Sequence, residues 1–160
     1  MSLVSIYTVG RLKHPIDHPA SLEFYEVGND IFGKAIMSGH LVEAFSPEGV
    51  TLPQDAIKGD GVPVLTLTVW KNLESLYRFS YSGLHRQALR ERSKWVASYP
   101  EKHLSYVIWW AENLKDVSWK EAFKRYDYYT QHGATSFAFD FKQAFDDKGE
   151  TYVVKKQRDE

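Results

Sequence analysis

The chain has 160 residues, a formal net charge of −1 and no cysteine. This length fits one domain with its own core, and the charge argues against a general nucleic-acid or anionic-membrane surface. The lack of cysteine excludes disulfides, a cysteine nucleophile and thiolate-bound metals, and it agrees with a reducing, cytoplasmic location. No apolar run approaches the ~20 residues of a membrane span, and the first residues lack a secretory signal pattern.

The first half of the chain predicts three strands, over residues 3–12, 39–46 and 64–70. The first segment alternates between two faces, and the third is rich in β-branched residues. Residues 21–37 carry apolar side chains at helical spacing and predict a helix, although Gly28 and Gly33 lower its propensity. The stretch Pro47–Pro63 is rich in proline and glycine, and its length is typical of a functional loop or lid.

The second half predicts three helices, over residues 72–83, 84–96 and 118–133, and two strands, over residues 103–111 and 135–141. Asn72 is the expected N-cap of the first helix, and Gly83 marks a break before the second. Ser118 and Glu121 form a capping-box pattern at the start of the last helix. Gly133 marks the end of that helix.

The order of these elements predicts an α+β fold. A βαββαβ unit followed by one more helix and strand is typical of a ferredoxin-like antiparallel sheet with helices on one face. We expect one domain over residues 1–145 and a polar tail over residues 146–160. Because "VPVLTLTVW" and "LSYVIWW" are apolar on both faces, the second face of the sheet needs a cover. A homodimer that packs sheet against sheet would provide it.

Three segments of the sequence resemble a known family. They are "LTVWKNLESLYRFSYSGLHRQALRERSKWV", "HLSYVIWWA" and "SWKEAFKRYDYYTQHGATSFAFDF". Together they resemble a bacterial family of unknown function in the dimeric α/β-barrel superfamily, which also holds the antibiotic-biosynthesis monooxygenases. The first segment is also similar to spheroidene monooxygenase and its relatives. The resemblance covers about Val4 to Phe141 and implies a ferredoxin-like protomer and a barrel-forming dimer.

His85 and Arg92 are the main candidates for chemistry. In a helix they share one stripe with Tyr81 and Trp95, and this stripe should face the sheet. His85 could donate or accept a proton, bind substrate or ligate haem, which several members of the superfamily bind. Arg92 could hold a substrate carboxylate or a haem propionate. The alternative is structural: a hydrogen-bonded core histidine, with Arg92 paired to a carboxylate such as Glu74 or Glu91.

Aromatic side chains suggest where a ligand could bind. Tyr81, Trp95 and Trp70 are candidates for the lining of an apolar pocket, although strand aromatics also fill cores and interfaces. Trp109 and Trp110 are adjacent on one strand and should point to opposite faces. We expect one to pack against the helices and the other in the dimer barrel.

Other motifs carry little chemistry. His14, Asp17 and His18 lie close together in "HPIDHP", but the prolines make this a turn in which Asp17 is a turn or cap residue, and no metal site is expected. Nucleotide, nicotinamide and zinc-hydrolase motifs do not occur. Three hypotheses follow: a monooxygenase acting on a small apolar or aromatic substrate, with haem or without a cofactor; a module binding haem or a lipophilic ligand without turnover; and a dimeric scaffold.

Overall fold

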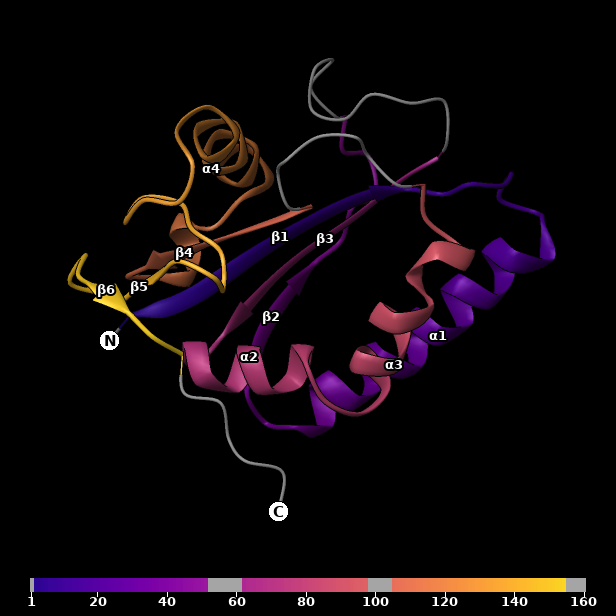
Figure 1. Ribbon diagram of the computed structural model, residues 1–160, viewed down its shortest axis with the longest axis horizontal. Coiled ribbons are helices and arrows are strands. Elements are labelled where there is room, and N and C mark those ends of the chain that lie inside the picture. The colour runs from indigo at the N-terminus through magenta and orange to yellow at the C-terminus, as the bar shows by residue number, and fades with distance from the viewer. Residues whose placement is uncertain (1, 52–61, 98–104, 155–160) are drawn as a thin grey trace.

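The computed structural model describes residues 2–51, 62–97 and 105–154 of the chain (Figure 1). Its main sheet contains β1 (Leu3–Arg11), β2 (Leu41–Phe45), β3 (Pro63–Trp70) and β4 (Tyr106–Ala111). The strand order is β2-β3-β1-β4, and each neighbouring pair is antiparallel. The helices are α1 (Pro19–Met37), α2 (Leu73–Ser80), α3 (Gly83–Glu91) and α4 (Trp119–His132), with short 3₁₀ turns η1 (Arg92–Lys94) and η2 (Leu114–Asp116). The predicted α+β class is therefore confirmed.

Local chemistry sets the helix ends where the sequence predicts them. The Asn72 side chain accepts a hydrogen bond from the backbone N–H of Ser75 at 2.8 Å, which caps α2. The Ser118 hydroxyl accepts from the N–H of Glu121 at 3.1 Å and caps α4. Gly133 ends α4 with a φ of 75°, a conformation that side chains with a Cβ disfavour. The predicted caps and stop are confirmed.

The predicted break at Gly83 is also confirmed. This glycine has a φ of 52° and starts α3 after two residues, Tyr81 and Ser82, that follow the end of α2. The second helix is shorter than predicted, because α3 ends at Glu91 and the chain continues as η1. Trp95 follows in a turn, with φ −115° and ψ −36°, and Val96 then forms a β-bridge with Leu12.

Helices cover both faces of the sheet, which differs from the one-sided arrangement predicted. Figure 1 shows α1, α2 and α3 on one side and α4 on the other. Beneath α4 lies a buried cluster that includes Tyr7, Val69 and Trp109. The ring of Tyr7 meets those of Phe123 and Tyr126 edge to face, with centroids 5.6 and 5.5 Å apart. Since α4 supplies the cover for this face within one chain, the apolar pattern by itself does not require a partner subunit.

Trp109 and Trp110 point to opposite faces, as predicted. Trp109 is buried in the cluster beneath α4 rather than in a dimer barrel. Trp110 lies on the other face, where its indole N–H donates to the carbonyl of Phe145 at 2.8 Å. The pair therefore connects β4 to two separate parts of the core.

The segment after α4 differs from the prediction of a regular strand. Phe139 forms an isolated bridge with Ile108, and the rest of residues 135–141 follows an irregular path. Two short strands follow, β5 (Ala144–Phe145) and β6 (Thr151–Tyr152), which pair as a hairpin. Val154 is buried in the core, so the predicted polar tail contributes one side chain to the core although most of its described residues are exposed. Among the described residues, no helix is long and apolar enough to cross a membrane.

Candidate functional site

Part of the sheet face that carries α1, α2 and α3 is not covered by them. Thr66 is exposed and Thr8 is half-buried, although both lie on the two central strands. The register places Thr8 between Thr66 and Tyr106, and the hydroxyls of Thr8 and Thr66 are hydrogen-bonded to each other. The Thr68 hydroxyl, one pleat further along, accepts from the indole N–H of Trp70 at 2.9 Å. We call Thr8, Thr66, Thr68 and Tyr106 the polar row.

Aromatic side chains connect the polar row to the α2–α3 junction. The rings of Trp70 and Phe79 lie 5.0 Å apart between centroids, and Phe79 lies 5.9 Å from the imidazole of His85. Trp70 is buried on the same face as the polar row. The sequence-predicted residues Trp70 and His85 therefore belong to one continuous group of side chains.

His85 is held in a single tautomer. Its Nδ1 lies 2.7 Å from the carbonyl oxygen of Ser80, and since a carbonyl only accepts, Nδ1 must carry the hydrogen. Burial lowers the pKa of His85, and the hydrogen bond to Ser80 opposes this in part. At neutral pH the ring is therefore uncharged, and Nε2 keeps its lone pair. This nitrogen can take a proton or bind a metal.

Tyr81 lies on the other side of the same junction. Its ring packs against Tyr77 at 4.8 Å and against Phe141 at 5.6 Å between centroids. Its hydroxyl is hydrogen-bonded to that of Tyr106, which also accepts from the backbone N–H of Phe141 at 3.2 Å. Burial raises the pKa of both Tyr81 and Tyr106. Both phenols stay protonated near neutral pH, and since one O–H joins the two rings, the pair has one O–H left to donate to a bound polar group.

Trp95 lies far from this group. Trp70 pairs opposite Val4, whereas the neighbour of Trp95, Val96, bridges to Leu12. Val4 and Leu12 are eight positions apart in the sequence, which corresponds to about 27 Å along a strand. Trp95 is buried and packs against Phe24, with ring centroids 6.0 Å apart. The structure thus brings together Tyr81, Trp70 and His85 around the polar row, but not Trp95.

Arg92 begins η1, seven residues after His85. This spacing corresponds to about 10 Å along a helix, so Arg92 lies about two turns from His85 rather than beside it. The carboxylates considered as its partners are engaged elsewhere. Glu91 pairs with Lys94 at 2.9 Å, and Glu74 accepts from the hydroxyl of Tyr152. Among residues 2–51, 62–97 and 105–154, none forms an ion pair with Arg92.

The histidines before α1 have a structural role. His18 is the N-cap of α1, because its Nδ1 accepts the backbone N–H of Ala20 at 3.0 Å. His14 stacks on it with ring centroids 4.0 Å apart. Asp17 lies in the turn, as predicted, but the cap is His18. Within the described ranges, no three histidine, cysteine or acidic side chains are grouped to hold a metal ion.

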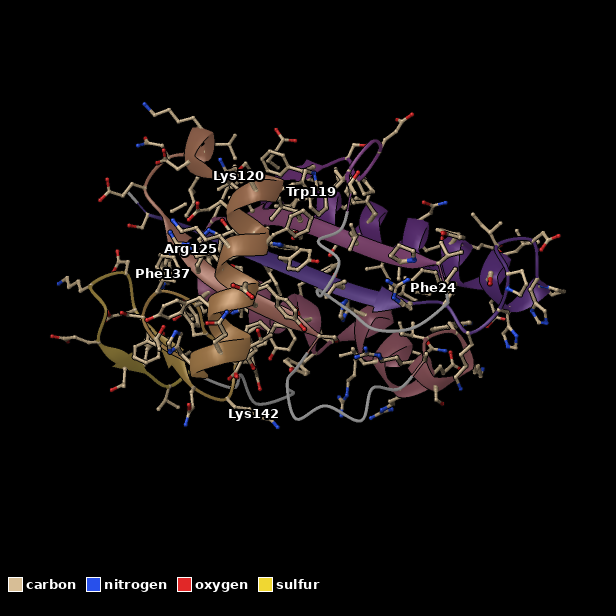
Figure 2. The ribbon with its side chains drawn as sticks, turned by 90° about the horizontal axis from the view of Figure 1, so that it is seen from above. Phe24, Trp119, Lys120, Arg125, Phe137 and Lys142 are labelled. Atoms are coloured by element: carbon tan, nitrogen blue, oxygen red, sulfur yellow. The ribbon has the colours of Figure 1, made fainter. Side chains whose placement is uncertain are left out.

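Two hollows occur elsewhere on the surface. The larger, of about 440 Å³, is lined by Lys124, Asp127, Tyr128, Gln131 and Phe137. The smaller, of about 280 Å³, is lined by residues of the β4 end and the β5–β6 turn, including Glu112 and Asp146. Beside the larger hollow, the guanidinium of Arg125 lies 3.7 Å from the ring centroid of Phe137, and Figure 2 shows both residues at the side of α4. Neither hollow includes His85.

Some residues of the candidate site escape sequence reasoning. Thr8 and Thr66 are 58 positions apart and are unremarkable as strand residues until the register joins them. Tyr106 and Phe141 meet only because the segment after α4 returns to β4. A usable signal was present in β3, where Thr66 and Thr68 are polar positions on one face of a central strand.

Comparisons with known proteins place the chain in a family without assigning an activity. No curated protein matches it significantly. A family model described as a domain of unknown function, DUF3291, matches residues 3–156. This match spans all of the described strands and helices, and the chain therefore belongs to the DUF3291 family.

Proposed function

We propose that this protein is a monooxygenase-like enzyme that binds a small apolar or aromatic substrate between the polar row and the α2–α3 junction. The observation that carries the proposal is the neutral His85, whose Nδ1 is fixed by the Ser80 carbonyl and whose Nε2 keeps a lone pair. The exposed Thr66 in a central strand supports access to this region. The resemblance to oxygenases of the dimeric α/β-barrel superfamily is consistent with this choice.

The reaction that fits these groups needs molecular oxygen and a substrate with an acidic CH₂ group, as in the keto tautomer of a hydroxylated polycyclic arene. His85 Nε2 removes a proton, and the resulting carbanion reduces O₂ to a substrate hydroperoxide. Breaking of the O–O bond leaves one oxygen as a carbonyl on the substrate. The other oxygen leaves as water with the proton held by His85 and the second hydrogen of the CH₂ group. The balance is CH₂ plus O₂ to C=O plus H₂O.

The remaining residues have positioning roles in this proposal. Tyr81 and Tyr106 are protonated phenols bonded to each other, so one O–H of the pair is left to donate to a substrate oxygen as negative charge develops on it. Trp70 and Phe79 provide an apolar wall beside His85. Arg92, about two helical turns away, would bind an acidic group at the far end of a longer substrate. Trp95 has a supporting role, since it holds η1 against Phe24 of α1.

The test uses the whole chain with a panel of hydroxylated polycyclic arenes in oxygenated buffer. We expect oxygen uptake and a product that has gained one oxygen and lost two hydrogens. His85→Gln should lower the rate about 100-fold or more, whereas His132→Gln, at the end of α4, should not change it. Saturable binding without turnover across the panel would contradict the enzymatic proposal and favour the binding module.

A second candidate is haem binding, favoured by the same histidine. A ligating histidine commonly donates its other N–H to a carbonyl, which is the arrangement of His85 and Ser80. A haem is larger than the substrates proposed above and neither of the two hollows described includes His85, so we rank this candidate second. A Soret shift with haemin that disappears in His85→Ala would favour it. No shift, or the same shift in His85→Ala, would exclude His85 as a haem ligand.

We also infer that the protomer is ferredoxin-like. The βαββαβ order and the strand order β2-β3-β1-β4 support this arrangement, and α4 is an addition to it. The homodimer expected from the sequence needs a different basis from sheet-to-sheet packing, because α4 covers that face.

A further inference from the structure

The outer side of α1 carries an apolar stripe that is exposed in the described part of the chain. Five large side chains lie on it or beside it, with exposures from 37% for Tyr25 to 79% for Met37: Leu22, Tyr25, Phe32, Ile36 and Met37. The spacing of the first four puts them on one side of the helix. The inward side is different, with Phe24 packed on Trp95 and Ala35 buried. Figure 1 places α1 at the periphery, with α3 beside it.

The area of this stripe is large for a monomer. Half-exposed side chains of this size contribute about 100 Å² each, or on the order of 500 Å² together, within the range of patches that are often functional. A stable interface buries about 800 Å² on each partner. The stripe and the polar residues that flank it can reach this area along a 19-residue helix. We propose that α1 binds α1 of a second copy of this chain about a two-fold axis near Asn29.

The sequence of α1 is self-complementary about that axis. Asn29 lies midway between Leu22 and Ile36, so a two-fold axis there places Leu22 of one copy beside Ile36 of the other. The same symmetry places Tyr25 opposite Gly33. The amide of Asn29 can both donate and accept, so two copies can satisfy each other at the axis.

The glycines of α1 have no explanation within one chain. Glycine lowers the stability of a helix interior, and a Cβ placed on Gly28 or Gly33 would meet no atom within 4 Å. The fold therefore does not need the missing side chains. A second helix that approaches closely at Gly33, with the Tyr25 ring seated on it, would need that space.

The test measures the mass of the full chain in solution by sedimentation equilibrium. We expect a dimer at micromolar concentration, and Phe32→Glu should raise its dissociation constant about 30-fold or more. Leu89→Glu, a similarly exposed site on α3, should leave it unchanged. A monomer at all concentrations, including one that binds lipid vesicles, would overturn the proposal. So would a dimer that Phe32→Glu does not weaken.

Cysteine cross-linking tests the position of the axis. The chain has no cysteine, so Asn29→Cys introduces one thiol per copy, and oxidation should give a disulfide-linked dimer. Lys34→Cys, on the opposite side of α1 from the stripe, should not cross-link. Equal cross-linking of both variants, or none with Asn29→Cys, would overturn an axis at Asn29. Circular dichroism of each variant confirms that the fold is retained.

Discussion

The Nδ1–H of His85 donates to the carbonyl oxygen of Ser80 across the α2–α3 junction at 2.7 Å. This bond spans the break at Gly83, so it fixes the imidazole and the angle between the two helices together. It also gives a hydrogen-bond donor to a carbonyl in the last turn of α2, where the helix itself supplies no backbone N–H partner. The chemical state of His85 and the geometry of the junction are therefore linked.

The pH dependence of stability should reveal the buried histidine. Burial lowers the pKa of His85 in the folded protein below its unfolded value of about 6.5. The unfolded chain then binds the proton more readily, so the stability contributed by neutral His85 is complete above pH ~6.5. It is lost as the pH falls from there through the folded pKa. Urea unfolding between pH 5 and 7.5 should therefore show a shallower acid loss in His85→Asn than in the wild type.

The same shift predicts the acid limb of activity under the proposed function. The base form of His85 persists below pH ~6.5 because its pKa is lowered. The pH profile of kcat/KM should stay flat through that value and fall only at lower pH. An acid limb centred above pH ~6.5 would show that a different group is the base.

Replacement of Gly83 should disturb the junction. A side chain at a φ of 52° is strained, and Gly83→Ala should destabilise the protein by about 1–2 kcal/mol. Asparagine tolerates this conformation better, so Gly83→Asn should recover part of the loss. Thermal unfolding of both variants measures the difference. Equal destabilisation would indicate that space rather than backbone conformation limits this position, although a Cβ there would meet no atom within 4 Å.

Asp140 should be among the most sensitive positions of the core. It is buried, and its carboxylate accepts the Tyr129 hydroxyl at 2.8 Å and the backbone N–H groups of Lys142 and Gln143, each at 2.8 Å. Asp140→Ala leaves these donors without an acceptor and should cost about 3 kcal/mol or more in the free energy of unfolding. Tyr129→Phe should cost less, about 1–2 kcal/mol. Chemical denaturation of the two variants gives this ranking, and a reversed order would contradict it.

The cap of α4 offers a smaller, local test. Ser118→Ala removes the acceptor for the N–H of Glu121 and should cost about 1 kcal/mol. Ser93→Ala, at an exposed position of η1, is the matched control and should be near neutral. Since α4 covers one face of the sheet, the loss should appear in global unfolding. A loss confined to local hydrogen exchange of α4 would mean that the helix unfolds separately.

Elements whose signals are local could be predicted from the sequence. The caps at Asn72 and Ser118 and the break at Gly83 depend on residues a few positions apart, and all three were predicted. The segment over residues 135–141 could not be predicted. Its alternating phenylalanines suggest a strand, yet Phe137 packs on Arg125 and Phe139 lies in the core beside Ile108.

In the candidate site, too, local features could be predicted from the sequence and contacts between distant segments could not. The helical stripe predicted that His85 faces inward, and it is half-buried, but its acceptor is a backbone carbonyl, which every residue carries and no sequence pattern identifies. The polar row depends on strand register between distant segments. The position of α4 could not be predicted, because the second apolar face of the sheet can be buried either by a second copy of the chain or by the chain's own last helix. The amino-acid composition of the strands is the same in both cases and does not distinguish them.

The cover supplied by α4 has a consequence for biosynthesis. The four strands of the main sheet are complete at Ala111, but the helix that shields Tyr7 and Trp109 ends only at His132. During translation, the nascent sheet therefore presents an apolar, aromatic surface to the ribosome exit and its chaperones until α4 emerges. A ribosome stalled in that interval would hold a chain that is prone to aggregation, and release of α4 would end this exposure.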